Sequence, residues 1–239
     1  GKDLCSDLMG RLTFTQYFHL LLTGREPTEP QSYFLDLLLV AIAEHGLVPT
    51  NQVARMTLAA DPASLQGAVA AGILGCGSVV LGTAQYCGDF LAEANALARE
   101  SGLSPDDAAR ALVEARRASG GRVPGFGHPL HKPVDPRAER ILELAETERV
   151  AATHVALARA SVAAVHAAWG KPLPMNVSMA IAAVLLDLDF PRSLIKAIPI
   201  LARTASLLAH LAEEQERPIG FLMAAHAEAA IDYEPGETD

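Results

Sequence analysis

The sequence predicts an all-α protein. Half of its 239 residues are hydrophobic but only 5% are aromatic, so Ala, Leu and Val must supply most of the core. Ala and Leu favour helix. No convincing run of alternating apolar and polar residues, the pattern of a half-buried strand, occurs along the chain. Capping boxes and glycine stops instead divide the sequence into helical segments.

Capping residues mark the helices of the first half. Residues 13–16 and 28–31 form two capping boxes, each followed by an apolar helix that a glycine ends. The small, apolar segment 59–84 predicts a tightly packed buried helix. Ser104 and Pro105 open a helix that reaches about residue 117.

The second half predicts further helices and no solenoid repeat. Residues 136–169 form one or two helices, and another Ala/Leu-rich helix opens within residues 174–178. A long helix runs from about 193 to 216. Arg217-Pro218 interrupts the chain before an Ala-rich helix that ends near residue 231.

Charge narrows the possible partners. The net charge of −9 argues against a nucleic-acid-binding protein, which would present a basic face. The positive charges nevertheless cluster around one loop, where a basic island suits a small polyanionic ligand better than a polymer. This island comprises Arg110, Arg116, Arg117, Arg122, Lys132, Arg137 and Arg140.

Cysteine content and hydropathy predict the compartment. Three cysteines do not form a disulfide framework, so we expect a reducing, cytoplasmic location. We expect no membrane-spanning segment, because no stretch is apolar for long enough without charges, and no signal peptide is visible.

The loop 121–140, GRVPGFGHPLHKPVDPRAER, carries the densest chemistry in the chain. Its glycines allow close approach to a ligand, and its prolines stiffen the backbone. His128 lies at its centre, and Asp135 is placed to cap a following helix. His128 and His131 could instead be metal ligands, but Pro129 lies between them and no third ligand follows at a usual spacing, so we expect no metal site.

GFGHPLHKPVDPRA resembles the signature of the citrate synthase superfamily, and it looks closest to the shorter citryl-CoA lyase branch. Four further segments match landmarks of that superfamily in the same order. They are LLLTGREPT, AEHGLVPTNQVAR, PMNVS and ARTASLLAHLAEE with the closing Arg217-Pro218.

The resemblance implies a large helical domain, residues 1–81 and 190–239, with a smaller helical domain, residues 82–189, inserted into it. It also implies a homodimer, in which Arg217 reaches the partner's site. No covalently bound cofactor is implied, because the CoA thioester is a substrate.

The resemblance also assigns roles to individual residues. His128 would be the catalytic histidine that contacts the oxygen on the central carbon of the substrate. The carboxylates of a di- or tricarboxylate would be bound by His45, Arg137, Arg203 and Arg217. His131 and Lys132 would lie near the CoA phosphates. Arginine suits such ligands because its guanidinium binds carboxylates bidentately.

Two positions depart from the synthase pattern. Val80 stands where synthases carry a second histidine, which points away from a synthase and towards a lyase. Ser178 stands where the superfamily has the carboxylate of Asn-Val-Asp. A serine hydroxyl is a poor acid–base group near neutral pH.

Three functions are therefore open. The first is a citryl-CoA lyase-like enzyme that cleaves a 3-hydroxyacyl-CoA to acetyl-CoA and a 2-oxo acid such as oxaloacetate. The second is a citrate synthase-like condensing enzyme, or an acyl-CoA lyase with a changed substrate. The third is a non-catalytic protein that binds acyl-CoA or carboxylates and has lost the acid.

Overall fold

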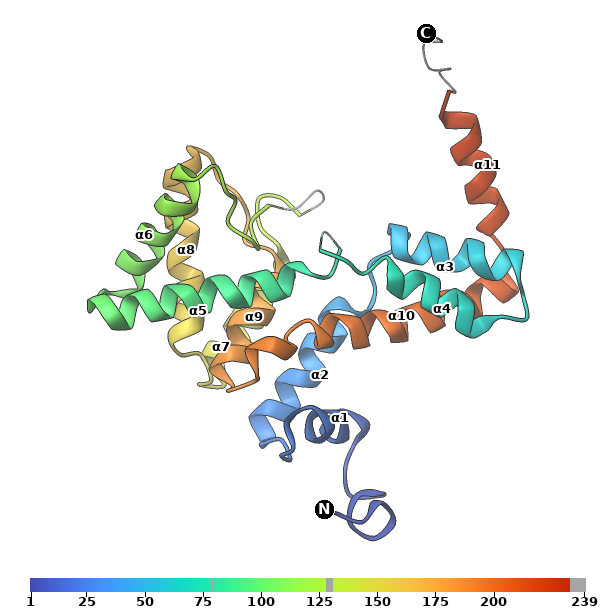
Figure 1. Ribbon diagram of the computed structural model, residues 1–239, viewed down its shortest axis with the longest axis horizontal. Coiled ribbons are helices and arrows are strands. Elements are labelled where there is room, and N and C mark those ends of the chain that lie inside the picture. The colour runs from blue at the N-terminus through green and yellow to red at the C-terminus, as the bar shows by residue number, and fades with distance from the viewer. Residues whose placement is uncertain (79, 128–130, 233–239) are drawn as a thin grey trace. The chain divides into compact units, whose positions relative to one another are not determined.

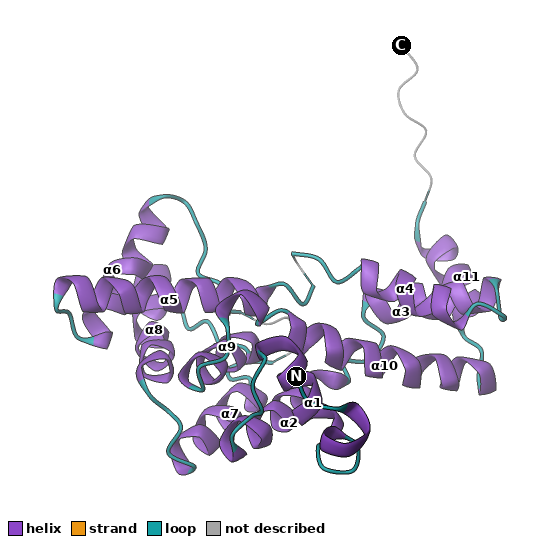
Figure 2. Ribbon diagram, turned by 60° about the horizontal axis from the view of Figure 1, so that its bottom comes forward, coloured by secondary structure: helices purple, strands orange, loops and turns teal. Residues whose placement is uncertain are grey.

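The computed structural model describes residues 1–78, 80–127 and 131–232, and within these ranges the protein consists of helices and loops without a strand (Figures 1 and 2). The all-α prediction is confirmed. An isolated antiparallel bridge joins Phe126 and Met175.

The described elements follow one another along the chain without a repeated unit. They are the π-helix η1 (Leu4–Leu8), α1 (Phe14–Thr23), α2 (Glu29–Ala43), α3 (Pro49–Ala60), α4 (Leu65–Leu74), α5 (Thr83–Ser101), α6 (Pro105–Ala118), α7 (Pro136–Thr147), α8 (Thr153–Trp169), α9 (Val177–Asp187), the 3-10 helix η2 (Arg192–Leu194), α10 (Ala197–Glu216) and α11 (Gly220–Ala230).

The predicted caps are present. Residues 13–16 form a capping box with both reciprocal hydrogen bonds, and residues 28–31 form a second one. Ser104 accepts a hydrogen bond from the Asp107 N–H at the start of α6. Asp135 caps α7, with Pro136 at its first position. Local capping chemistry thus sets the helix starts that the sequence predicts.

The prediction of one buried helix over residues 59–84 is wrong in extent. Among its described residues, the segment contains the end of α3, the short helix α4 (Leu65–Leu74) and the start of α5, with non-helical connections between them. The glycines do permit close packing at one point, because a Cβ at Gly72 would lie 2.8 Å from the Leu207 side chain. Helices α3 and α5 begin without a side-chain cap, so the capping signals did not reveal them.

The chain packs as two compact units. One contains residues 1–41 and 81–199, and the other contains residues 42–80 and 200–239. Domains that close on a ligand are defined by relative movement rather than by packing. The division expected from the resemblance, 82–189 inserted into 1–81 and 190–239, therefore stays a prediction.

The first unit has α9 at its centre. Helix α9 packs against α5, α7 and α8, and α6 packs against α5 and α8 (Figure 1). Residues 179–184 of α9 are all buried. A helix that is apolar on every side belongs in the middle of a bundle, because it has no polar face for water.

The second unit is built on α3. Helix α3 packs against α4 and against α11 (Figure 1). Its apolar core joins α3 and α4 to the latter part of α10 through Ala54, Leu58, Ala68, Leu207 and Leu211. Polar groups are buried beside this core, and they form part of the candidate site.

The segment Arg192–Glu216 is long and apolar enough, by length and composition, to cross a membrane, contrary to the sequence expectation. The same test is met by core helices of other proteins. Here 44% of the apolar window is buried, and Arg203, His210 and Glu214 are buried polar residues on the same helix.

Asp187 clamps the start of α8. Its carboxylate accepts hydrogen bonds from the backbone N–H groups of Ala152, His154 and Val155, and it contacts His154 Nδ1 at 2.8 Å. Burial opposes ionisation, but the His154 side chain and the three backbone donors more than offset it, so the pKa of Asp187 lies below its ordinary value.

We predict that Asp187→Asn lowers the free energy of unfolding at pH 7 by about 1–3 kcal/mol, because a buried acceptor of several hydrogen bonds loses its charge. A lowered pKa contributes stability above the unfolded pKa of about 4, and this contribution is lost as pH falls through the folded pKa. The variant should therefore lose less stability on acidification. Denaturant titrations at pH 7 and pH 3 test this, with exposed Asp189→Asn as the matched control. Equal losses in the two variants would contradict the clamp.

Candidate active site

The glycine loop is held against the segment that precedes α9. The Gly127 N–H donates to the Pro174 carbonyl at 2.8 Å, and the Asn176 N–H donates to the Gly125 carbonyl at 2.8 Å. The Asn176 side-chain amide donates to the Gly127 carbonyl at 3.1 Å. These bonds fix the backbone directly before residues 128–130, which lie outside the described residues. The prediction that His128 is catalytic therefore falls on a residue outside the described ranges.

Asp135 ties this loop to α7 and α9. Its fully buried carboxylate accepts from the Val177 N–H at 3.0 Å and from the Arg137 N–H at 3.1 Å. It also accepts from Arg137 Nε at 3.1 Å and Nη2 at 2.9 Å. Burial opposes ionisation, but Arg137 and the Val177 N–H more than offset it, so the pKa of Asp135 lies below its ordinary value. A fork-to-fork pair of this kind fixes the plane of the guanidinium.

Ser178 occupies the second position of α9. The Asn176 side chain caps this helix by accepting from the Ser178 N–H at 3.1 Å. The side chain of Ser178 is half-buried, and its hydroxyl forms no hydrogen bond with a described residue. The structure thus brings Ser178, Arg137 and the glycine loop together through Asp135 and Asn176.

Much of the basic island is neutralised locally. Arg110, Arg116 and Arg140 form ion pairs with Asp107, Glu93 and Glu143, and Arg117 lies over the Trp169 ring at 5.0 Å. Within the described ranges Arg122 and Lys132 form no ion pair. Lys132 is exposed and His131 is half-buried. Fewer cationic side chains are therefore available to a ligand than the sequence suggests.

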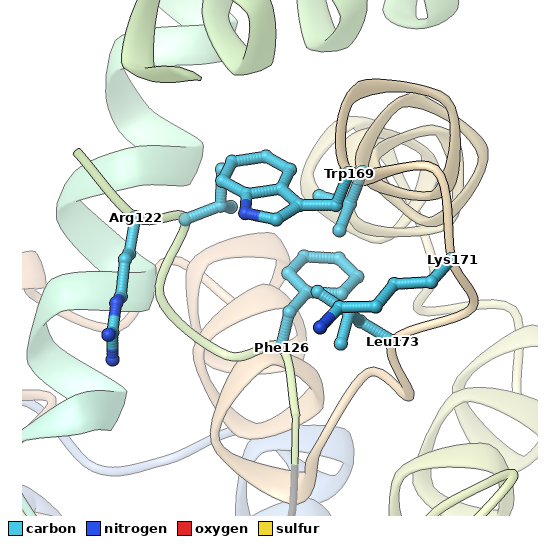
Figure 3. Close-up of a pocket in the computed structure, with 7 residues that line it drawn as sticks. Arg122, Phe126, Trp169, Lys171 and Leu173 are labelled. Carbon is cyan, nitrogen blue, oxygen red and sulfur yellow. The ribbon is translucent and has the colours of Figure 1, made fainter. Parts of the chain in front are cut away.

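A cavity of about 300 Å³ opens beside the glycine loop (Figure 3). Phe126 and Trp169 present their rings to it, and the cationic side chains of Arg122 and Lys171 flank it. Sequence reasoning included Arg122 in the basic island but missed Trp169 and Lys171, because residues 47 positions apart carry no local signal of contact.

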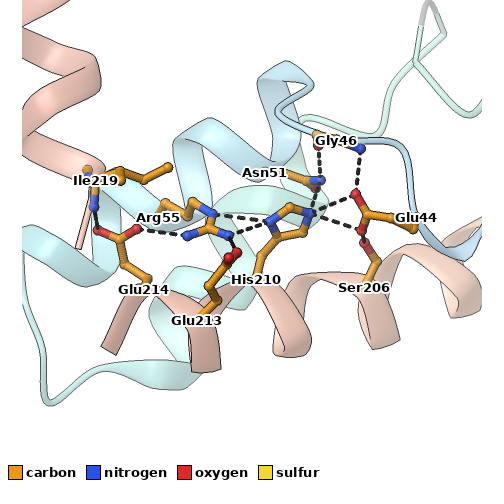
Figure 4. A network of polar contacts seen from close by, with 10 residues as sticks. Glu44, Gly46, Asn51, Arg55, Ser206, His210, Glu213, Glu214 and Ile219 are labelled. Atoms are coloured by element: carbon orange, nitrogen blue, oxygen red, sulfur yellow. Dashed lines mark hydrogen bonds and ion pairs between the residues drawn. The ribbon is translucent and has the colours of Figure 1, made fainter. Parts of the chain in front are cut away.

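The second unit contains the other predicted carboxylate ligands. His45 lies in the loop between α2 and α3, and it is half-buried. Glu44 and Gly46, on either side of it, take part in a polar network with α3 and α10 (Figure 4). Arg217 follows the end of α10 and is exposed.

Arg203 is the unusual member of this group. It is only 2% exposed, and its sole hydrogen bond among the described residues runs from Nη1 to Asn51 Oδ1 at 3.2 Å. Its Nε is buried without a partner in those residues. Burial lowers the pKa of this guanidinium from its ordinary value, more strongly than neighbouring Cys76 and Glu44 raise it. The described residues thus place no carboxylate within ion-pair distance of this buried cation.

Arg55 shows the contrasting arrangement. It is equally buried, but it donates to the carboxylate of Glu214 at 3.1 Å and forms a second ion pair with Glu213. It also donates from Nε to His210 Nδ1 at 3.1 Å. The sequence carries no local signal for the contact between Arg55 and His210, which lie 155 positions apart. Neither Arg55 nor Glu214 was singled out.

No group of three potential metal ligands occurs in the part of the chain that the structure describes. The described residues thus form an all-helical protein with an anchored glycine loop in one unit and a buried arginine without an ion-pair partner in the other. The chain matches the family described as citrate synthase, C-terminal domain, over residues 4–220, and it belongs to that family.

Three comparisons place it more closely. Citryl-CoA lyase from Hydrogenobacter thermophilus shares 30% identity at a TM-score of 0.84, and the match covers 97% of this chain and 88% of that one. ATP citrate lyase from Methanothrix soehngenii, solved with citrate and coenzyme A, matches at a TM-score of 0.78 and 20% identity, over 98% of this chain and 39% of that one. At that identity the match shows the fold alone.

The third is a curated sequence, citrate synthase from Heyndrickxia coagulans. It is 26% identical over 208 residues, which are 86% of this chain and 53% of that protein. The chain thus spans about half the length of this relative. The resemblance to the citrate synthase superfamily is confirmed.

The glycine loop provides a matched test of its packing. Gly125 and Gly127 both have positive φ, of 79° and 90°. A Cβ at Gly125 would lie 2.7 Å from Cys87 Sγ and 2.8 Å from Met179 Cβ, whereas a Cβ at Gly127 meets no described atom within 4 Å. We predict that Gly127→Ala costs about 1–2 kcal/mol of backbone strain. Gly125→Ala should cost about 1–3 kcal/mol more, because it also overpacks the core.

Denaturant unfolding of both variants measures the difference. Equal destabilisation would contradict the enclosed position of Gly125. A larger loss for Gly127→Ala would show that its surroundings are tighter than described.

Proposed function

We propose that this protein is a citryl-CoA lyase-like enzyme that cleaves a 3-hydroxyacyl-CoA, citryl-CoA or a close relative, to acetyl-CoA and a 2-oxo acid. The proposal is supported by family membership and by similarity to a citryl-CoA lyase over nearly the full length of both chains. Valine at position 80, where synthases carry a histidine, favours cleavage over condensation.

Arg203 is the observation that carries the carboxylate part of the proposal. A buried guanidinium without a carboxylate partner is costly, because desolvation is not repaid by an ion pair. A substrate carboxylate would supply the missing acceptor at Nε. Arg137, which Asp135 holds in a fixed plane, is proposed as a second carboxylate ligand. His45 and Arg217 complete the set on the strength of the resemblance.

The proposed chemistry needs a base at one end of the breaking bond and an acid at the other. His128 would take the proton of the tertiary alcohol. The carbonyl of the 2-oxo acid then forms as the carbon–carbon bond breaks, and the bonding electrons pass to the acetyl carbon as the CoA enolate. Protonation of that carbon completes the cycle. Ser178 stands at the position from which the superfamily supplies the acid.

The cavity between Phe126 and Trp169 is proposed to take part in binding CoA. Two aromatic walls suit a flat base, and Arg122 and Lys171 suit a phosphate. Lys132 and His131, on the same loop, are proposed to lie near the remaining phosphates. We further propose a homodimer, because α11 exposes Phe221, Leu222 and neighbouring apolar residues that a second copy would cover.

We predict that Lys132→Glu weakens CoA affinity about 5- to 20-fold at low salt, because a charge-assisted phosphate contact is replaced by repulsion. The effect should shrink as ionic strength rises. Calorimetric titration with CoA at two salt concentrations measures it, and oxaloacetate affinity should hardly change. Arg99→Glu, an exposed charge reversal in the last turn of α5, is the control. Equal effects of the two reversals would remove Lys132 from the site.

Ser178 decides between catalysis and binding alone. We predict weak citryl-CoA cleavage in the unmodified protein, and a gain of about 10²–10⁴-fold in Ser178→Asp, which restores a general acid. Ser178→Asn, in which the new side chain is similar in size to Asp but carries no acid, should give no gain. Full activity with Ser178 in place would show that another group supplies the proton.

The serine at position 178 also supports a second candidate function, binding without catalysis. Tight binding of CoA esters without turnover in the unmodified protein, and no gain in Ser178→Asp, would favour a non-catalytic acyl-CoA or carboxylate-binding protein. Cleavage of a different 3-hydroxyacyl-CoA would favour a lyase with a changed substrate.

A further inference from the structure

A continuous chain of buried polar contacts crosses the second unit from the loop that carries His45 to the start of α11 (Figure 4). From Glu44 it passes to His210, continues through Arg55 and ends at Glu214, while Gly46 links Glu44 to Asn51. Among these residues only Glu44 and Gly46 are exposed.

His210 lies at the centre of the chain, and its tautomer is set by its neighbours. Arg55 Nε and Nη2 lie 3.1 Å and 2.8 Å from His210 Nδ1. A guanidinium only donates, so Nδ1 accepts and the hydrogen of a neutral ring is on Nε2. That nitrogen faces the Glu44 carboxylate, at 3.1 Å from Oε2. The Asn51 amide nitrogen, 2.8 Å away, is also a donor, so in this tautomer the hydrogen bond of Nε2 runs to Glu44 and not to Asn51.

The contacts on either side of His45 restrain its backbone. Glu44 accepts from His210, from the Ser206 hydroxyl at 3.2 Å and from the Gly46 N–H. The Gly46 carbonyl accepts from the Asn51 amide at 2.6 Å. Asn51 also accepts from Arg203. The same few groups therefore fix the residues flanking His45 and one end of the Arg203 guanidinium.

The other end of the chain restrains the segment after α10. One oxygen of Glu214 accepts from Arg55, and the other accepts from the Ile219 and Gly220 N–H groups at 2.8 Å and 2.7 Å. Glu214 thus caps the start of α11, which begins three residues after Arg217. A Cβ at Gly220 would lie 2.7 Å from Ala59 Cβ and 2.9 Å from the Arg55 carbonyl, so this attachment is tight.

We propose that His210 and Glu214 are positioning residues. His210 holds the His45 loop and Arg203 in place for a substrate carboxylate, and Glu214 holds the turn that carries Arg217. The inference rests on the proposed function, in which those three residues bind carboxylates. It assigns no direct contact with substrate to His210 or Glu214.

Two substitutions at His210 test the central contact. Gln can accept from Arg55 with its oxygen and donate to Glu44 with its nitrogen, whereas Leu has a similar volume but can do neither. We expect His210→Leu to weaken oxaloacetate binding about tenfold or more, and His210→Gln to stay within about threefold of the unmodified protein. CoA affinity should change by less than about twofold in both, because the proposed CoA ligands lie in the other unit.

Two neighbouring glutamates test the far end. Glu213 and Glu214 both pair with Arg55, but the side chain of Glu213 is 56% exposed and that of Glu214 only 2% exposed. Only Glu214 also caps α11. Glu214→Gln should increase amide hydrogen exchange at Ile219 and Gly220 by about tenfold or more, whereas Glu213→Gln should leave it nearly unchanged.

The outcomes separate the inference from the function it rests on. Equal loss of oxaloacetate and CoA binding in His210→Leu, or no rescue by Gln, would overturn the positioning role and indicate general destabilisation. Unchanged exchange at Gly46 and Leu47 in His210→Leu would overturn it as well. Failure of the unmodified protein to bind any di- or tricarboxylate would instead overturn the proposed function, and the inference with it.

Discussion

The first unit depends on the buried carboxylate of Asp135. This one group caps α7, holds the guanidinium of Arg137 and accepts from the first N–H of α9. A buried charge is tolerated only when its hydrogen bonds are made. The helix starts that carry Arg137 and Ser178 must therefore meet at one point, and the glycine loop is paired to the same place through Asn176.

The two buried arginines of the second unit, Arg55 and Arg203, differ in their partners. Arg55 has two carboxylates and an imidazole as partners, whereas Arg203 has a single amide oxygen among the described residues. The first arrangement stabilises a fold, and the second leaves binding capacity for an anion. Since both guanidiniums are almost fully buried, the difference lies in their partners, and this difference supports our proposal that Arg203 binds a carboxylate.

Local chemistry was predictable from the sequence, and long-range pairing was not. The caps at Thr13, Ser104 and Asp135 depend on residues within three positions, so they could be read directly. The contacts of Arg55 with His210 and Glu214 join residues more than 150 positions apart, and no periodicity encodes them. The ordered landmarks supplied the family, but only the structure distinguished paired from unpaired arginines. The placement of His128 and the domain division remain predictions.

We propose that Arg203 is buried without a carboxylate partner among the described residues because it binds a substrate carboxylate. Arg203→Met removes the charge and keeps an unbranched side chain, and replacing an unpaired buried cation by an apolar group should not destabilise the fold. Calorimetric titration of oxaloacetate into the unmodified protein and this variant tests the claim most directly. We expect saturable binding in the former and a loss of at least about 100-fold in the latter, as for a buried charge-assisted contact. Equal affinity in the two proteins would contradict it.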